Sequence, residues 1–159
     1  MLFRSQFVRG TKVPPRDAKL AGSASALAGE RLFQSIGCAA CHVSTIVTAP
    51  AGTLIDGSTF AVPVALGNKI IHPYSDFLLH DIDTGDGIVQ TPPQDTANKL
   101  RTAPLWGLRV RPRYMHDLKS LTLENAIDRH GSEAKEARQE FQRLSESEKQ
   151  ELFLFLNSL

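Results

Sequence analysis

The sequence has 159 residues, of which 42% are hydrophobic and 22% charged, and its formal net charge at pH 7 is +1. This length fits one compact domain of roughly 100–150 residues, and the near-neutral charge argues against a nucleic-acid-binding protein. No apolar run approaches the ~18 residues of a membrane-spanning helix. The two cysteines lie in one local motif, which excludes a disulfide scaffold.

The first 20 residues contain no signal peptide. Their longest apolar run, residues 1–3, is far shorter than the ~7–15 residues of a hydrophobic region, and Arg4 and Arg9 interrupt the residues after it. Pro14 and Pro15 cannot continue a helix, so they predict an extended linker. We therefore expect residues 1–22 to be a linker or the remnant of an upstream domain, and residues 23–159 to form one domain.

Hydrophobic residues at helical spacing predict a helix over residues 25–35, which Gly37 ends. Closer to the C-terminus, Thr122 is a good N-cap, and Gly131 is expected to stop the helix that Thr122 begins. A further helix is predicted over residues 132–143.

The last predicted helix begins with a capping box formed by Ser145 and Glu148. Its apolar face comprises Leu152, Phe155, Leu156 and Leu159. Residues 43–112, in contrast, are rich in glycine and proline turn signals, and we expect no more than a hairpin there, around residues 60–66.

The motif Cys38-Ala39-Ala40-Cys41-His42 matches the C-x-x-C-H signature of covalent haem attachment. Two thiols about one helical turn apart can reach the two vinyl groups on one edge of a porphyrin. The adjacent histidine then points its imidazole at the iron. The sequence therefore predicts one covalent haem c, with Cys38 and Cys41 as attachment points and His42 as an axial ligand.

Three other interpretations of the two cysteines remain open. A dithiol redox site of the thioredoxin type also uses C-x-x-C, although it expects a βαβ setting. Buried free thiols that match the motif by chance are the second alternative. The third is a zinc site, in which Cys38 and Cys41 would be joined by two of the remaining histidines, His72, His80, His116 and His130.

The second axial ligand is predicted to be His130, because it shares a helical face with Leu123 and Ile127. Imidazole and thioether are both common haem ligands, so Met115 is the alternative. His80 and His116 each adjoin an aspartate, which is typical of an oriented structural imidazole. His72 precedes a proline and is expected in a loop.

Two further groups of polar residues could bind ligands. Residues 81–87 alternate carboxylates as calcium loops do, but they fail the helix-loop-helix template, so a solvated turn is favoured over calcium. Four arginines surround Trp106, and one or two of them could pair with haem propionates, because a guanidinium matches a carboxylate. They are Arg101, Arg109, Arg111 and Arg113. The additional candidates for haem contacts are Arg101, Trp106, Met115 and His116.

Several runs in this order resemble the C-terminal haem domain of the bacterial di-haem c-type oxidoreductases. This family of peroxidase-like or thiol-oxidoreductase-like proteins is related to the di-haem cytochrome c peroxidases. The similar runs are residues 29–33 with 36–43, 72–81, 101–108, 114–117, 122–124 and 130–134. Residues 7–16 resemble the linker between the two haem domains of that family, so the resemblance covers nearly the whole chain.

The resemblance implies a distal ligand fourteen residues after His116, which is His130. Two departures from the family are notable. Leu118 stands where the family usually has glycine after His-Asp, and the chain has one C-x-x-C-H, so the family's other haem domain, where peroxide chemistry is expected, is missing from it.

Together these patterns predict a mainly α, cytochrome c-like haem domain with a long loop-rich insertion between the haem motif and the distal-ligand helix. The expected function is single-electron transfer with bis-His iron, in contact with a redox partner protein or an adjacent haem domain. The alternatives are a peroxidase-like oxidoreductase, in which His80 or His116 acts as acid or base alongside an upstream haem domain, and a zinc or dithiol redox domain. Covalent haem also predicts an exported, periplasmic protein.

Overall fold

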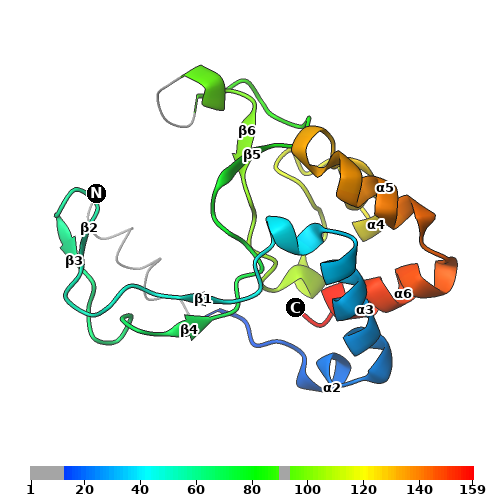
Figure 1. Cartoon of the computed structure of the whole chain (residues 1–159), viewed down its shortest axis with the longest axis horizontal. Helices are drawn as coiled ribbons and strands as arrows, with labels where there is room; N and C mark the ends of the chain where they lie inside the picture. The colour runs from blue at the N-terminus through cyan, green and yellow to red at the C-terminus, as the bar shows by residue number, and fades with distance from the viewer. Residues whose placement is uncertain (1–12, 90–93) are drawn as a thin grey trace.

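The computed structural model describes residues 13–89 and 94–159, and the helices of these parts gather on one side of the molecule (Figure 1). The helices are α2 (Ala18–Ala21), α3 (Ala24–Ser35), α4 (Leu123–Asp128), α5 (Lys135–Arg143) and α6 (Glu146–Leu156). Short 3-10 turns are η1 (Cys38–Ala40), η2 (Gln94–Thr96), η3 (Leu108–Val110) and η4 (Ser132–Ala134). None of the described helices is long and apolar enough to cross a membrane.

The loop-rich middle contains three two-stranded antiparallel sheets. β1 (Ile46–Val47) pairs with β4 (Ile70–Ile71), β2 (Leu54–Ile55) with β3 (Phe60–Ala61), and β5 (Leu79–Asp81) with β6 (Lys99–Arg101). The predicted hairpin is therefore present, but its strands are Leu54–Ile55 and Phe60–Ala61, and residues 62–66 lie outside it.

The prediction of a mainly α, cytochrome c-like fold with a loop insertion is wrong. Helices make up 37% of the structure and strands 11%, so the sheets belong to the architecture. The error has a physical reason, because each strand is only two or three residues long and too short to show an alternating pattern.

The predicted helix boundaries are largely confirmed. Ser23 caps α3 by accepting a hydrogen bond from the Ala26 N–H at 3.2 Å, and Gly37, with φ of +93°, follows its C-cap in the left-handed conformation that glycine favours. Thr122 caps α4, and the capping box of Ser145 and Glu148 begins α6.

Two details differ from the predictions. The helix α4 ends at Asp128 with Arg129 as its C-cap, so His130 lies just beyond it, and Gly131 is extended rather than left-handed. Glycine is required at 131 for a different reason: an added Cβ would lie 2.1 Å from Asp83 Oδ2. The segment after α4 is therefore held close to the turn after β5.

The core lies where α3 and α6 cross. Gly29 permits this contact, because a Cβ at this position would lie 2.0 Å from the carbonyl oxygen of Glu151. All four residues of the predicted apolar face of α6 are buried. The core comprises Phe33, Ile36, Tyr74, Leu108, Phe141, Leu152, Phe155, Leu156 and Leu159.

Residues 13–17 have no helix or strand and lie against the C-terminal end of the chain. The backbone N–H of Asp17 donates to the Ser158 carbonyl at 2.8 Å, and Arg16 Nε donates to Ser158 Oγ at 3.0 Å. The Arg109 guanidinium donates to the carbonyls of both Pro15, at 2.8 Å, and Leu159, at 2.6 Å. These bonds fix the segment on the domain.

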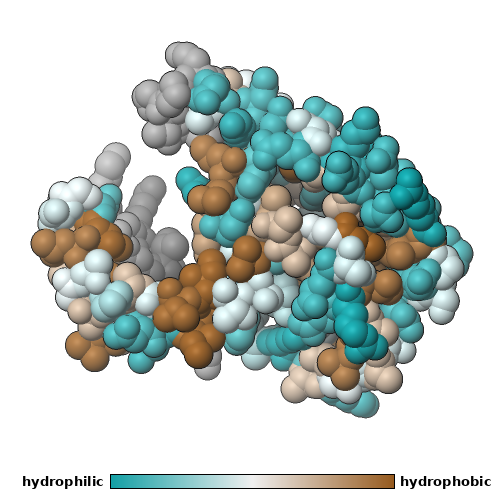
Figure 2. All heavy atoms as spheres, viewed as in Figure 1, coloured by the Kyte–Doolittle hydropathy of each residue, from teal (hydrophilic) through white to brown (hydrophobic). Residues whose placement is uncertain are grey.

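The sheets β1–β4 and β2–β3 form an arm that extends away from the helices (Figure 1). Apolar side chains are exposed over this arm, as the space-filling view shows (Figure 2). They are Val47, Leu54, Ile55, Val64 and Ile70.

Candidate functional site

A cavity of about 1160 Å³ lies beside the core, between η1, α4, α5 and the segment of residues 100–118. This volume slightly exceeds the roughly 300–1,000 Å³ range of ordinary cofactor and ligand pockets, so the cavity has room for a large cofactor. Its walls include many apolar side chains, among them Phe33, Ile36, Leu105, Leu108, Leu123, Ile127, Leu152 and Leu156.

Both cysteines of the C-x-x-C-H motif line this cavity. Burial raises the pKa of Cys38 to about 12. The pKa of Cys41 is raised by burial and by the charges of Asp76 and Glu133. Reactive dithiols have a lowered thiol pKa instead, so the two side chains do not have the environment of a thioredoxin-type redox site.

His42 lines the same cavity, and its ring orientation is fixed. Its Nδ1 lies 2.8 Å from the carbonyl oxygen of Tyr74, and because a carbonyl can only accept, Nδ1 carries the proton. Burial lowers the pKa of His42 to about 4, so the imidazole is neutral. Its Nε2 therefore has a free lone pair, which is the state that a metal requires.

His130 lines the same cavity and has the same arrangement. Its Nδ1 lies 2.8 Å from the carbonyl oxygen of Ala126, one turn earlier in α4, and burial lowers its pKa. Within residues 13–89 and 94–159, neither the Nε2 of His42 nor that of His130 has a hydrogen-bond partner. The cavity therefore contains two neutral imidazoles whose free nitrogens are suited to bind iron.

The other three histidines have different surroundings. His116 lines the cavity but is more than half exposed, with its Nε2 2.9 Å from Asp86 Oδ2. His72 lies outside the cavity, and its Nδ1 is 3.1 Å from Thr45 Oγ1. His80 also lines the cavity, and both of its ring nitrogens contact carboxylates.

Of the further candidates for haem contacts, Arg101 and Met115 also line the cavity, whereas Trp106 does not. The Trp106 Nε1 donates to the His72 carbonyl at 2.7 Å, beside a second, smaller cavity. Arg101 donates to the carbonyl of Phe77. The other arginines near Trp106 also donate to backbone carbonyls: Arg109 to Leu159 and Pro15, Arg111 to Pro104 and Trp106, and Arg113 to Leu118.

The carboxylates of residues 81–87 also bind backbone N–H groups. Asp81 Oδ1 accepts from Asp83 N at 3.0 Å, Asp83 Oδ2 from Ser132 N at 2.9 Å, and Asp86 Oδ1 from Ile88 N at 2.9 Å. Short acidic side chains that bind the local backbone in this way are typical of turns, and a solvated turn is the prediction favoured for these residues.

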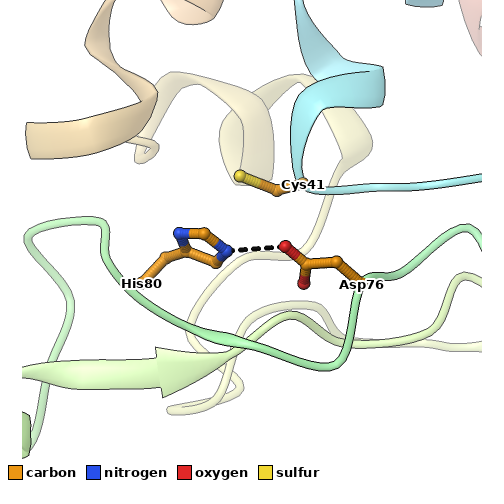
Figure 3. A group of neighbouring side chains, drawn as sticks. All are labelled: Cys41, Asp76 and His80. Carbon is orange, nitrogen blue, oxygen red and sulfur yellow. Dashed lines mark hydrogen bonds and ion pairs between the residues drawn. The ribbon is translucent and has the colours of Figure 1, made fainter.

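Sequence patterns did not identify several residues that shape the site. Tyr74 orients His42 through its carbonyl group, and its hydroxyl donates to Glu30 Oε1 at 2.9 Å. Asp76 lies beside Cys41 and His80 (Figure 3). Tyr74 and Asp76 lie far along the sequence from His42 and Cys41, so no local spacing connects them to the C-x-x-C-H motif.

The donor set and the cavity together fit a haem. Two thiols sit on one wall, two neutral imidazoles present free Nε2 atoms, and apolar side chains surround them. A family model described as "Di-haem oxidoreductase, putative peroxidase" matches residues 5–159. The chain belongs to this family of di-haem oxidoreductases. The family resemblance in the sequence is thereby confirmed, and membership in this family indicates that the chain binds haem.

Among solved structures, the chain is similar to hydrazine synthase of Kuenenia stuttgartiensis, determined under xenon pressure. The sequences are 20% identical, the TM-score is 0.54, and the match covers 94% of this di-haem oxidoreductase chain and 50% of the hydrazine synthase chain. The chain thus spans half the length of that relative, and at this identity the likeness concerns the fold alone. No curated protein matches the chain.

Proposed function

We propose that this chain binds one haem c through thioether bonds at Cys38 and Cys41, and that it carries single electrons to or from a partner haem domain. In this proposal His42 and His130 would hold the haem iron through their Nε2 atoms. The observation that carries it is the matched pair of neutral imidazoles, each held by a carbonyl at its Nδ1 and each lining one large cavity.

The residues of the chain have three roles in this function. Cys38 and Cys41 anchor the cofactor by one edge, and the carbonyls of Tyr74 and Ala126 orient the two imidazoles. The apolar wall excludes water, which lowers the reorganisation that accompanies each electron transfer. Arg101 lines the cavity and supplies a guanidinium for a haem propionate. When bound, the haem iron supplies the one-electron redox couple.

Two imidazole ligands leave no open iron position for a substrate and give a lower reduction potential than histidine–methionine ligation. They favour electron transfer over catalysis at this haem. Because thioether attachment of haem takes place outside the cytoplasm, we also propose an exported, periplasmic location.

The test is the absorption spectrum of the full chain, made with c-haem maturation proteins, in the oxidised and reduced states. We expect a low-spin spectrum with sharp reduced α and β bands that peroxide and cyanide leave unchanged. His130→Ala is expected to give a high-spin ferric spectrum, whereas His72→Ala, outside the cavity, is the matched control and should not. A low-spin spectrum lost in Met115→Leu but kept in His130→Ala would assign the ligand to Met115.

A peroxidase-like enzyme is the second candidate, because the family description names that activity and His80 and His116 both line the cavity. In that function one of these imidazoles would hold or release a proton for the substrate. A high-spin ferric spectrum of the unaltered chain that changes on addition of peroxide would favour this candidate and exclude the bis-imidazole carrier.

A further inference from the structure

Beside the proposed iron ligands lies a group of donor atoms that the haem proposal does not use as a metal site. Cys41 Sγ, an oxygen of Asp76 and a ring nitrogen of His80 all lie within 4.8 Å of one another. Cys41 directly follows η1, His80 belongs to β5, and Asp76 lies in the segment just before β5; the three side chains point toward one another (Figure 3). Cys41 and His80 also line the large cavity.

The three donors differ in kind but match one metal. Thiolate, imidazole and carboxylate are the ligands of Zn²⁺, and a thiolate argues against Mg²⁺ and Ca²⁺, which prefer oxygen. Zinc bonds of about 2.0–2.3 Å place tetrahedral ligand atoms roughly 3.5 Å apart. Small side-chain movements would therefore bring the three atoms to a common ion.

His80 is held as zinc-binding histidines are held. Its Nε2 lies 2.8 Å from Asp76 Oδ2, and its Nδ1 lies 2.9 Å from Glu133 Oε2. Metal-binding histidines usually give their second ring nitrogen to a carboxylate, which fixes the tautomer and the ring orientation. Glu133 is itself fixed, because its Oε1 accepts a hydrogen bond from the Asp81 N–H at 3.0 Å. Asp76 is held in the same way, since its Oδ1 accepts from the Leu78 N–H at 2.9 Å.

The local charge attracts a cation. Asp76 and Glu133 place two carboxylates around one imidazole, and an oxygen of Asp76 also lies within 4.8 Å of the Cys41 sulfur. The positive charges that act on Glu133 are those of His80 and of Lys99, which lies in β6. Among the described residues, the positive charge that acts on Asp76 is that of His80.

We propose that Cys41, Asp76 and His80 bind one Zn²⁺ ion in the chain before haem is attached, with Glu133 as the carboxylate that orients His80. Binding replaces two protons, one from the Cys41 thiol and one from the His80 Nε2, and both are released to solvent. The fourth position is left for water from the cavity side, as in zinc sites with three protein ligands. Because the same sulfur cannot be both a thiolate ligand and a thioether, zinc at this site and full haem attachment exclude each other.

The experiment uses the full chain made without haem maturation proteins, kept reduced and titrated with Co²⁺ as a spectroscopic probe of the zinc site. We expect a sulfur-to-cobalt charge-transfer band and tetrahedral ligand-field bands, with release of protons, and displacement of Co²⁺ by Zn²⁺. Cys41→Ser should abolish the charge-transfer band. Asp76→Asn and His80→Ala should each weaken binding at least tenfold, and Glu133→Gln should weaken it by about 10–100-fold.

Cys38→Ser is the matched control, because it removes the neighbouring thiol of the same motif, and it should keep the band and the affinity. Absence of a charge-transfer band in the unaltered chain would overturn the proposal. So would a band that is lost in Cys38→Ser and kept in His80→Ala, since the ion would then be held by the two cysteines. Circular dichroism of each variant identifies any that fails to fold. In that case the Co²⁺ affinity of the conservative variant Asp76→Asn decides whether the proposed site binds the ion.

This site does not depend on the proposed electron transfer. A cobalt band in the haem-free chain together with a high-spin haem spectrum would retain the zinc site and reject the bis-imidazole carrier. A low-spin haem spectrum without a cobalt band would do the reverse.

Discussion

The Nδ1 atom of His42 lies 2.8 Å from the carbonyl oxygen of Tyr74, and this contact determines which nitrogen of the ring is free. Tyr74 adopts a left-handed backbone, with φ of +50°, which is uncommon for a bulky residue. Its side chain is anchored by Glu30 and packs edge-on against Phe33 and Phe155. The orientation of His42 therefore depends on the contacts that the Tyr74 side chain makes with Glu30, Phe33 and Phe155.

The first prediction concerns the hydroxyl of Tyr74. Tyr74→Phe keeps the carbonyl bond to His42 but removes the 2.9 Å hydrogen bond to the Glu30 carboxylate. A hydrogen bond to a charged group contributes about 1.5–3 kcal/mol, so the free energy of unfolding should fall by about that amount. Tyr114→Phe is the control, because no partner of its hydroxyl is found within the described residues. Denaturant titration measures both, and equal losses would contradict the prediction.

The second prediction concerns the crossing of α3 and α6. Gly29→Ala would normally favour a helix by about 1 kcal/mol, but here the new methyl group would lie 2.0 Å from the Glu151 carbonyl oxygen. The two helices must separate, and overpacking of this kind costs about 1–3 kcal/mol. We expect a lower melting temperature. Gly22→Ala, whose methyl group would meet its nearest atom at 3.3 Å, should change the melting temperature much less.

The third prediction is that a substitution of Leu118 stabilises the domain. Leu118 is an exposed leucine with φ of +57°, at the position where the resemblance to the family leads us to expect glycine. A left-handed backbone costs a residue with a Cβ about 1–2 kcal/mol, and glycine avoids this cost. Part of this gain is offset, because glycine loses more conformational entropy on folding than other residues. Leu118→Gly should therefore raise the free energy of unfolding by up to about 1 kcal/mol. Leu121→Gly, at an exposed leucine without positive φ, should lower it, and a loss in both variants would show that Leu118 is not strained.

A pH dependence arises from the ion pair of Asp117 and Arg129. Hydrogen bonds from Arg129 lower the pKa of Asp117 from its ordinary value of 3.8 to about 2. The native carboxylate thus holds its proton more weakly than the unfolded one, so the pair contributes stability above pH 4 that is lost as the pH falls from about 4 to about 2.

Asp117→Asn should lose this part of the acid dependence, which unfolding curves measured between pH 2 and pH 6 would detect. If Asp117→Asn retained the full acid dependence of the unaltered chain, the ion pair would not be its source.

The local parts of this structure could be predicted from sequence. The caps Thr122 and Ser145, the buried face of α6 and the left-handed Gly37 all depend on residues within one or two helical turns. The C-x-x-C-H motif is local in the same sense. His130 was placed on the face of a helix that in fact ends two residues earlier, but it lines the same cavity as His42.

The non-local parts could not be predicted. β5 pairs with β6 across nearly 20 residues of sequence, and each strand has only three residues, too few for an alternating pattern. Tyr74 acts on His42 through a backbone carbonyl, which leaves no trace in the residue type. Glu133 reaches His80 only because the turn after β5 lies against the segment after α4.

The docked segment of residues 13–17 is connected to a cavity-lining residue, His42, through Arg16 and Tyr74. Arg16 contacts Ser158, Glu30 and the hydroxyl of Tyr74, whose carbonyl holds the ring of His42. The segment that enters the domain and the ring of His42 are thus linked through a single residue, Tyr74, whose hydroxyl contacts Arg16 and whose carbonyl accepts from the imidazole.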